Sequence, residues 1–113
     1  MKVQHYTDIE QSAPPLPNAQ STIRWLISEK DGAKNFAMRV IEISHKGEKI
    51  PLHAHDYEHE VFVITGTGRV FTKDASADMK FGDFVFVPAD EPHGFENSGD
   101  DPFRFICVIP IKH

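Results

Sequence analysis

The stretch His53-Ala54-His55-Asp56-Tyr57-Glu58-His59 places three histidines within seven residues. The run at residues 61–64 that follows, Val-Phe-Val-Ile, has the β-branched and aromatic composition of a strand. A fourth histidine, His93, follows a similar run at residues 84–87. Histidines two apart on a strand point to the same face, and imidazole is a common protein ligand for transition metals. The spacing therefore predicts one metal site assembled from two strand segments.

The rest of the chain also consists of short apolar runs separated by turns. Residues 74–78, Asp-Ala-Ser-Ala-Asp, predict a loop. No segment has a convincing apolar repeat of 3.6 residues, and strands at intervals of about 8–12 residues indicate a sandwich or a barrel. The expected fold class is therefore all-β, with strands at 25–27, 36–43, 60–64, 69–72, 84–87, 95–96 and 103–109.

Composition describes one ordinary globular domain. The chain has 113 residues, 40% hydrophobic and 26% charged, enough for one core. Acidic residues outnumber basic ones by 17 to 12, which argues against nucleic acid or an anionic membrane as a partner. No stretch approaches the roughly 20 apolar residues of a membrane span, and the first residues lack the apolar core of a signal peptide. Cys107 has no second cysteine for a disulfide, and a cytoplasmic location is expected.

The first 20 residues are polar and contain Pro14-Pro15-Leu16-Pro17. Proline cannot donate a hydrogen bond to a sheet, so residues 1–20 are predicted to form an extended arm and residues 21–113 the barrel. Ordering a free arm costs entropy. Pairing with a sheet edge of a second subunit would cover a strand that is otherwise prone to aggregate, so a homodimer is expected.

Glycines, a proline and an asparagine extend the histidine pattern. The fixed positions are Gly47, His53, His55, His59 and Gly66, followed by Gly82, Pro88, His93 and Asn97. Their order and intervals resemble, almost residue for residue, the two signature motifs of the cupin superfamily. The resemblance covers about residues 36–110, and a match at so many fixed positions is highly specific. It implies a single-domain jelly-roll β-barrel, usually dimeric.

Two positions depart from the motifs. Asp90 stands where the second motif has glycine, and aspartate tolerates the left-handed αL conformation better than most residues. His59 stands where the first motif usually has a metal-binding glutamate, while the adjacent Glu60 offers a different register. Only one of these neighbours can face the interior from a strand. The six-residue interval to Gly66 favours His59, and Glu60 is the alternative metal ligand.

With four histidines, the chain resembles the small manganese-binding single-domain cupins of bacteria. The resemblance implies one divalent metal per chain with two open coordination positions, held by His53, His55, His59 and His93. Manganese is favoured, although Fe, Ni, Cu, Co and Zn also suit imidazole ligands. The remaining histidines, His5, His45 and His113, are interpreted as ordinary surface or core residues.

The expected chemistry follows from the charge of the ligands. Four neutral imidazoles leave the double charge of the metal uncompensated, so the site favours anionic or oxygen-donor ligands and acts as a Lewis acid. Arg39 is a candidate pocket residue whose guanidinium would hold a carboxylate, with a subunit interface or solvent as the alternative. Phe95, Phe105 and Cys107 are further pocket candidates, with core packing as their alternative.

These features support three hypotheses about function. The first is a metal-dependent dioxygenase, an oxidoreductase acting on a small organic substrate, as the resemblance suggests. The second is a non-catalytic cupin that binds or senses a small molecule or metal. The third, a Lewis-acid isomerase or lyase, is weakened because no good general base stands beside the ligands. No residue is assigned a catalytic role from the sequence.

Overall fold

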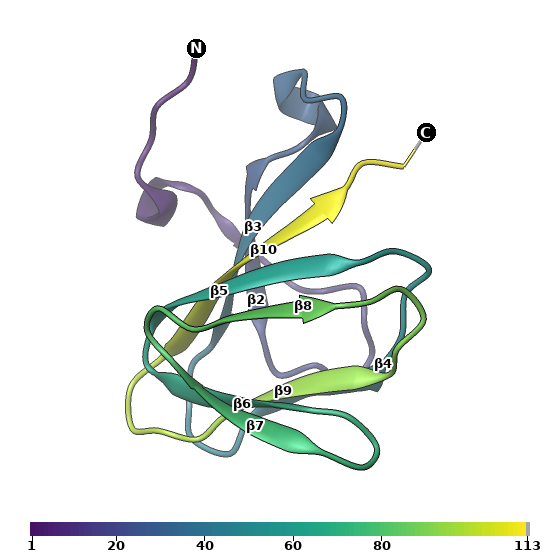
Figure 1. Cartoon of the computed structure of the whole chain (residues 1–113). Coiled ribbons are helices and arrows are strands. Elements are labelled where there is room, and N and C mark those ends of the chain that lie inside the picture. The colour runs from purple at the N-terminus through teal and green to yellow at the C-terminus, as the bar shows by residue number, and fades with distance from the viewer. Residues whose placement is uncertain (113) are drawn as a thin grey trace.

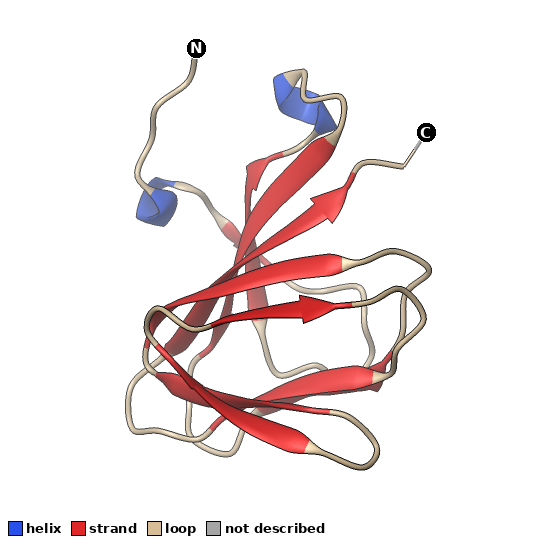
Figure 2. Cartoon of the chain, in the orientation of Figure 1, coloured by secondary structure: helices blue, strands red, loops and turns tan. Residues whose placement is uncertain are grey.

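The structure, a computed structural model, describes residues 1–112, so that His113 lies outside the described residues. Strands dominate it, and the two helices are single 3₁₀ turns (Figure 2). No helix within residues 1–112 is long and apolar enough to cross a membrane. The elements are η1 (Tyr6–Asp8), β1 (Gln11–Ser12), β2 (Thr22–Ile27), η2 (Glu29–Asp31), β3 (Phe36–Ile43), β4 (Lys49–His53), β5 (His59–Thr65), β6 (Thr67–Phe71), β7 (Ser76–Lys80), β8 (Phe84–Val87), β9 (His93–Asn97) and β10 (Phe103–Pro110).

The strands form two antiparallel sheets. One has the order β1-β2-β3-β10-β5-β8 and the other β4-β9-β6-β7, and Figure 1 shows them as two layers. The apolar core lies between the layers, where the inward positions of β10 alternate with half-buried ones. Phe103 and Phe105 on β10 and Ile43 and Val63 on the neighbouring strands have no exposed surface. The all-β jelly-roll barrel expected from the sequence is confirmed.

One predicted loop is wrong. Residues 76–80 form β7, which pairs with β6 from Thr67↔Lys80 to Phe71↔Ser76. This strand lies at a sheet edge, and four of its five residues are exposed while only Met79 is buried. A strand with one buried side chain shows no alternation of apolar and polar residues, so its sequence has the composition of a loop.

The N-terminal arm folds back on its own chain. β1 pairs with β2 through Gln11↔Arg24 and Ser12↔Ile23, and the side chain of Arg24 donates to the carbonyl of Ile9 at 3.0 Å. The segment after β1 then crosses to the second sheet, where the backbone N–H of Gln20 donates to the carbonyl of Lys49 at 3.0 Å. The arm therefore forms part of its own subunit's barrel.

Two turns explain fixed positions of the motifs. Gly66, between β5 and β6, has a φ of 74°, and a Cβ there would lie 2.4 Å from the carbonyl oxygen of Pro102. Asp90 has a φ of 67°, which confirms the left-handed conformation expected where the motif has glycine. Its backbone N–H donates to the carbonyl of His55 at 2.6 Å. This bond ties the turn before β9 to the histidine-rich segment.

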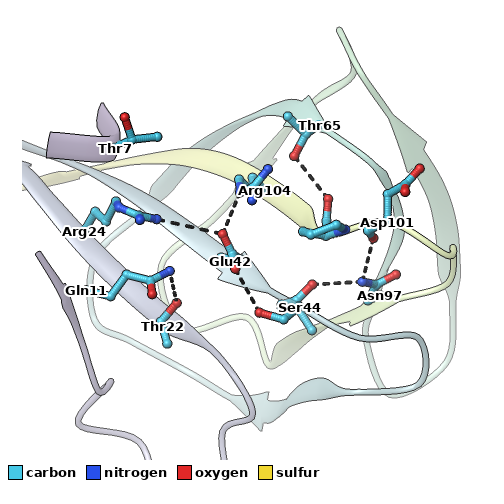
Figure 3. A network of polar contacts seen from close by, with 12 residues as sticks. Thr7, Gln11, Thr22, Arg24, Glu42, Ser44, Thr65, Asn97, Asp101 and Arg104 are labelled. Carbon is cyan, nitrogen blue, oxygen red and sulfur yellow. Dashed lines mark hydrogen bonds and ion pairs between the residues drawn. The ribbon is translucent and has the colours of Figure 1, made fainter. Parts of the chain in front are cut away.

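Asn97 joins the two sheets at the end of β9. Its side chain is fully buried, and Nδ2 donates to the carbonyl of Ile43 at 2.8 Å and to that of Asp101 at 3.0 Å (Figure 3). Its Oδ1 accepts from the backbone N–H of Gly99 at 2.9 Å. Because β9 also carries His93, these bonds fix the strand that presents one of the candidate metal ligands.

Candidate metal centre

His53 and His93 face each other across the two strands that carry them. They are register partners of β4 and β9, and their ring centroids are 4.5 Å apart. The Nδ1 atom of His53 lies 2.8 Å from the carbonyl oxygen of Pro51, and that of His93 lies 2.8 Å from the carbonyl oxygen of Glu91. A carbonyl can only accept, so both Nδ1 atoms carry the proton and both Nε2 atoms have a free lone pair.

His55 completes a cluster of three. It lies in the short segment between β4 and β5, where its ring stacks on Tyr57 with centroids 4.9 Å apart. One potential ligand atom from each of His53, His55 and His93 lies within 4.8 Å of the others. With Zn–N distances of about 2.0–2.1 Å, two ligands of one ion lie at most about 4.2 Å apart, so small side-chain movements would bring the three nitrogen atoms onto one ion.

His59 points inward from the first position of β5. Its side chain is buried, whereas the neighbouring Glu60 is exposed, and its ring centroid lies 4.8 Å from that of His55 and 5.3 Å from that of His93. Its Nδ1 lies 3.1 Å from Sγ of Cys107, while its Nε2 is buried without a partner. Buried polar atoms are nearly always bonded, so this orphaned nitrogen fits a ligand to a metal.

Burial and repulsion from neighbouring cationic groups favour the neutral form of His55, His59 and His93. Burial above all, and nearby cationic groups after it, lower the pKa of His55 to about 4 and that of His59 to about 3. Burial also lowers the pKa of His93. Neutral imidazole is the form that binds a metal. These three histidines can therefore bind a divalent transition metal near pH 7 without first losing a proton.

A cavity of about 140 Å³ opens beside the histidines. All four pocket candidates from the sequence line it: Arg39, Phe95, Phe105 and Cys107. Nη2 of Arg39 donates to Sγ of Cys107 at 3.0 Å, so the thiol links this cation to His59. Burial raises the pKa of the Cys107 thiol despite the neighbouring Arg39. The thiol therefore stays protonated at pH 7.

Part of the cavity wall was not anticipated from the sequence. Pro14, Pro15 and Leu16 of the arm and Ser21 beside β2 also line it. The alternation of Ser21, Ile23 and Trp25 is a period-two signal that could have assigned them to one face. The arm residues carry no such periodicity. Their role depends on the backbone pairing of β1 with β2, which proline-rich composition does not reveal.

The chain matches the family model described as "Cupin domain" over residues 40–109. It is similar to the structure of the polyketide cyclase RemF from Streptomyces resistomycificus, with 33% identity and a TM-score of 0.92 over 99% of this chain and 80% of that one. A predicted oxalate decarboxylase from Thermotoga maritima shares the fold, with 22% identity and a TM-score of 0.82 over 98% and 100% of the two chains. The uncharacterized protein MJ1618 of Methanocaldococcus jannaschii is 26% identical over 95% of this chain and 88% of its own.

Proposed function

The chain belongs to the cupin family, and on that premise we propose that it is a metal-dependent enzyme that cyclises an apolar, oxygen-bearing organic substrate. One observation carries this proposal: the histidine cluster opens into a cavity whose described lining contains no aspartate or glutamate. Such a cavity suits an apolar substrate with few polar groups. The similarity to a polyketide cyclase at 33% identity supports the same class of reaction.

In this proposal His53, His55, His59 and His93 hold one divalent transition metal. The Nδ1 bonds of His53 and His93 and the unpartnered Nε2 of His59 support that ligand set. When bound, the metal supplies Lewis-acid stabilisation of negative charge on a substrate oxygen. Manganese is the ion expected from the resemblance, and elemental analysis of protein from its native host tests that choice.

The surrounding side chains position the substrate and exclude water. Phe95 and Phe105 stack with centroids 4.6 Å apart and form an apolar wall next to His93. Trp25 lies at the cavity with 41% of its surface exposed. An apolar wall favours a folded conformation of a flexible chain, because folding removes apolar surface from water. These residues would therefore bring the reacting carbons together.

A dioxygenase is the second candidate. It is favoured by the neutral donor set, because a metal that keeps its full charge and has open positions attracts dioxygen-derived anions as well as a substrate oxygen. A non-catalytic small-molecule binder remains the outcome if neither reaction occurs.

One experiment separates these functions. The metal-free protein is loaded with Zn or Mn and incubated with N-acetylcysteamine thioesters of short polyketones, with and without oxygen. We expect cyclised product with either metal and without oxygen, and none from the His55→Ala variant. Turnover that requires oxygen and a redox-active metal would establish the dioxygenase instead. Binding without turnover under every condition would establish the binding module.

We also propose that two copies associate through the outer face of β5 and β8. Phe62 and Phe84 are register partners there, 42% and 78% exposed, and Phe86 beside them is 55% exposed. β8 is the edge strand of its sheet. An apolar face at an unpaired edge suits a two-fold interface in which each copy presents the same patch.

A further inference from the structure

Three buried side-chain atoms have no hydrogen-bond partner within residues 1–112: Ser21 Oγ, Arg39 Nε and His59 Nε2. All three residues line the same cavity. Buried polar atoms without partners are rare in folded proteins, so their concentration at one cavity indicates that a ligand completes their bonds. The proposed metal would be the partner of Nε2 of His59. Nε of Arg39 and Oγ of Ser21 need a different partner.

Arg39 is a buried cation without a counter-charge. Its side chain is only 8% exposed, its Nη2 bonds a neutral thiol, and its guanidinium carbon lies 5.3 Å from the centre of the Trp25 ring. Within the described residues it forms no ion pair with a carboxylate. Burying an unpaired charge is costly. An anionic group on the ligand would supply both the missing charge and the partner for Nε.

Ser21 lines the same cavity from the segment just before β2. Trp25 is the register partner of Arg39, and Ser21 precedes it by four residues on the inward-facing side of the same segment. At about 3.3 Å per residue, the backbone positions of Ser21 and Trp25 are roughly 13 Å apart, from which we infer that Ser21 lies at the end of the cavity away from Arg39. The hydroxyl of Ser21 can donate to or accept from an oxygen at the end of a ligand that Arg39 holds at its other end.

The space between these ends is apolar and small. Phe105, Ile41 and Ile23 line it. The cavity volume of about 140 Å³ is close to the roughly 150 Å³ of an engineered apolar cavity that holds benzene. One ring therefore fills the enclosed part.

We propose that this site takes a single-ring apolar carboxylate with a second oxygen at its far end: Arg39 binds the carboxylate and Ser21 binds the distal oxygen. This substrate class rests on the proposed function, because it shares the cavity with the metal. The contact from Arg39 through Cys107 to His59 places the carboxylate on the metal side. A carboxylate oxygen at that position would accept a hydrogen bond from Nε of Arg39 and would also lie near the positive charge of the proposed metal.

Calorimetry on metal-loaded protein tests the assignment with three matched probes. 4-Hydroxycinnamate has both groups, cinnamate lacks the hydroxyl, and 4-hydroxycinnamyl alcohol lacks the charge. We expect wild-type protein to bind 4-hydroxycinnamate at least about 10-fold more tightly than either of the others. Arg39→Met should abolish only the preference for the carboxylate and keep the preference for the hydroxyl group. Ser21→Ala should abolish only the preference for the hydroxyl group. Arg39→Lys, which keeps the charge but lacks Nε, should fall between.

Arg69→Met, at a half-buried position, and Ser76→Ala, at an exposed one, are matched controls on the second sheet. Metal content and melting temperature identify a variant that fails to fold. Equal affinity of wild-type protein for the three probes, no binding of any at millimolar concentration, or an acid preference that survives Arg39→Met would overturn the inference. The expected binding preferences without turnover would contradict only the proposed catalysis. If the protein cyclises substrates that carry no acid group but shows no preference among the three probes, only the proposed ligand class is contradicted.

Discussion

Sγ of Cys107 lies 3.1 Å from Nδ1 of His59, and Arg39 donates to the same sulfur at 3.0 Å. If Nε2 of His59 binds a metal, Nδ1 must carry the proton and donate it to the sulfur. Replacing Cys107 with valine keeps a similar volume but removes the acceptor. We expect the Cys107→Val variant to bind the metal about 10-fold to 100-fold more weakly, the usual effect of losing a bond that orients a ligand.

Competition with a chromophoric chelator measures this affinity. Cys107→Ser retains an acceptor and should lose less, while Ile43→Val, a buried change away from the histidines, should leave metal affinity unchanged. Equal affinity in Cys107→Val and wild-type protein would show that the sulfur does not orient His59.

The metal-free protein should lose stability in mild acid. Folding lowers the pKa of His55 to about 4 and that of His59 to about 3 from an ordinary value of 6.5, so the unfolded chain binds protons more readily than the folded one. Stability is therefore complete above about pH 6.5 and falls as the pH drops toward 4. Each such histidine contributes a slope of at most about 1.4 kcal/mol per pH unit.

Urea unfolding of metal-free protein at several values between pH 7.5 and pH 4 measures this slope. His59→Gln should reduce it, whereas His45→Gln, at an exposed position, should not. An identical slope in His59→Gln and wild-type protein would place the acid sensitivity elsewhere.

The two signature motifs predicted more of the molecule than local composition did. β3, β8 and β10 follow apolar runs rich in β-branched and aromatic residues, and the inward orientation of His59 follows from its interval to Gly66. β7 and β1 could not be predicted, because an exposed edge strand and a two-residue bridge leave no periodic signal. The arm's contribution to the cavity likewise depends on long-range pairing, which no local pattern encodes.

Glu42 should stabilise the barrel in a pH-dependent way. Burial by itself raises the pKa of this carboxyl, but hydrogen bonds from Arg104 and Ser44 outweigh it and hold the pKa below 4.5. Nε of Arg104 lies 2.5 Å away and Nη1 of Arg24 3.8 Å away (Figure 3). We expect Glu42→Gln to lower the free energy of unfolding by about 2 kcal/mol at pH 7.

A carboxyl whose pKa is lowered by folding stabilises the protein above its unfolded pKa and loses that effect as the pH falls through its folded value. The difference between Glu42→Gln and wild-type protein should therefore shrink below about pH 4.5, as chemical denaturation at pH 7 and pH 3.5 would show. Glu96→Gln is the control, because Glu96 pairs with Arg69 at 3.6 Å on a more exposed surface and should cost under about 0.5 kcal/mol. A difference that stays constant with pH would mean that charge is not involved.

A comparison of alanine variants at Gly66 and Gly82 distinguishes the cost of backbone strain from that of a steric clash. Both have positive φ, 74° and 92°, but a Cβ at Gly66 would lie 2.4 Å from the carbonyl oxygen of Pro102, while one at Gly82 meets nothing within 4 Å. We expect Gly82→Ala to cost about 1 kcal/mol from strain alone. Gly66→Ala should cost about 3 kcal/mol or more, because the backbone of Pro102 must also move. Equal midpoints of thermal unfolding for the two variants would contradict the clash.

The proposed dimer depends on Phe84 and Phe86 at the edge of the six-stranded sheet. Wild-type protein should have twice the 12.8 kDa mass of the chain in light scattering coupled to size exclusion, and Phe84→Glu should give the monomer mass, since a charge in an apolar two-fold interface is repeated in both copies. Phe36→Glu is the matched control, because Phe36 is 65% exposed on β3, away from that edge. If the dimer dissociates with Phe36→Glu but not with Phe84→Glu, the interface contains β3 rather than the β8 edge. If wild-type protein is a monomer, the proposed dimer is wrong.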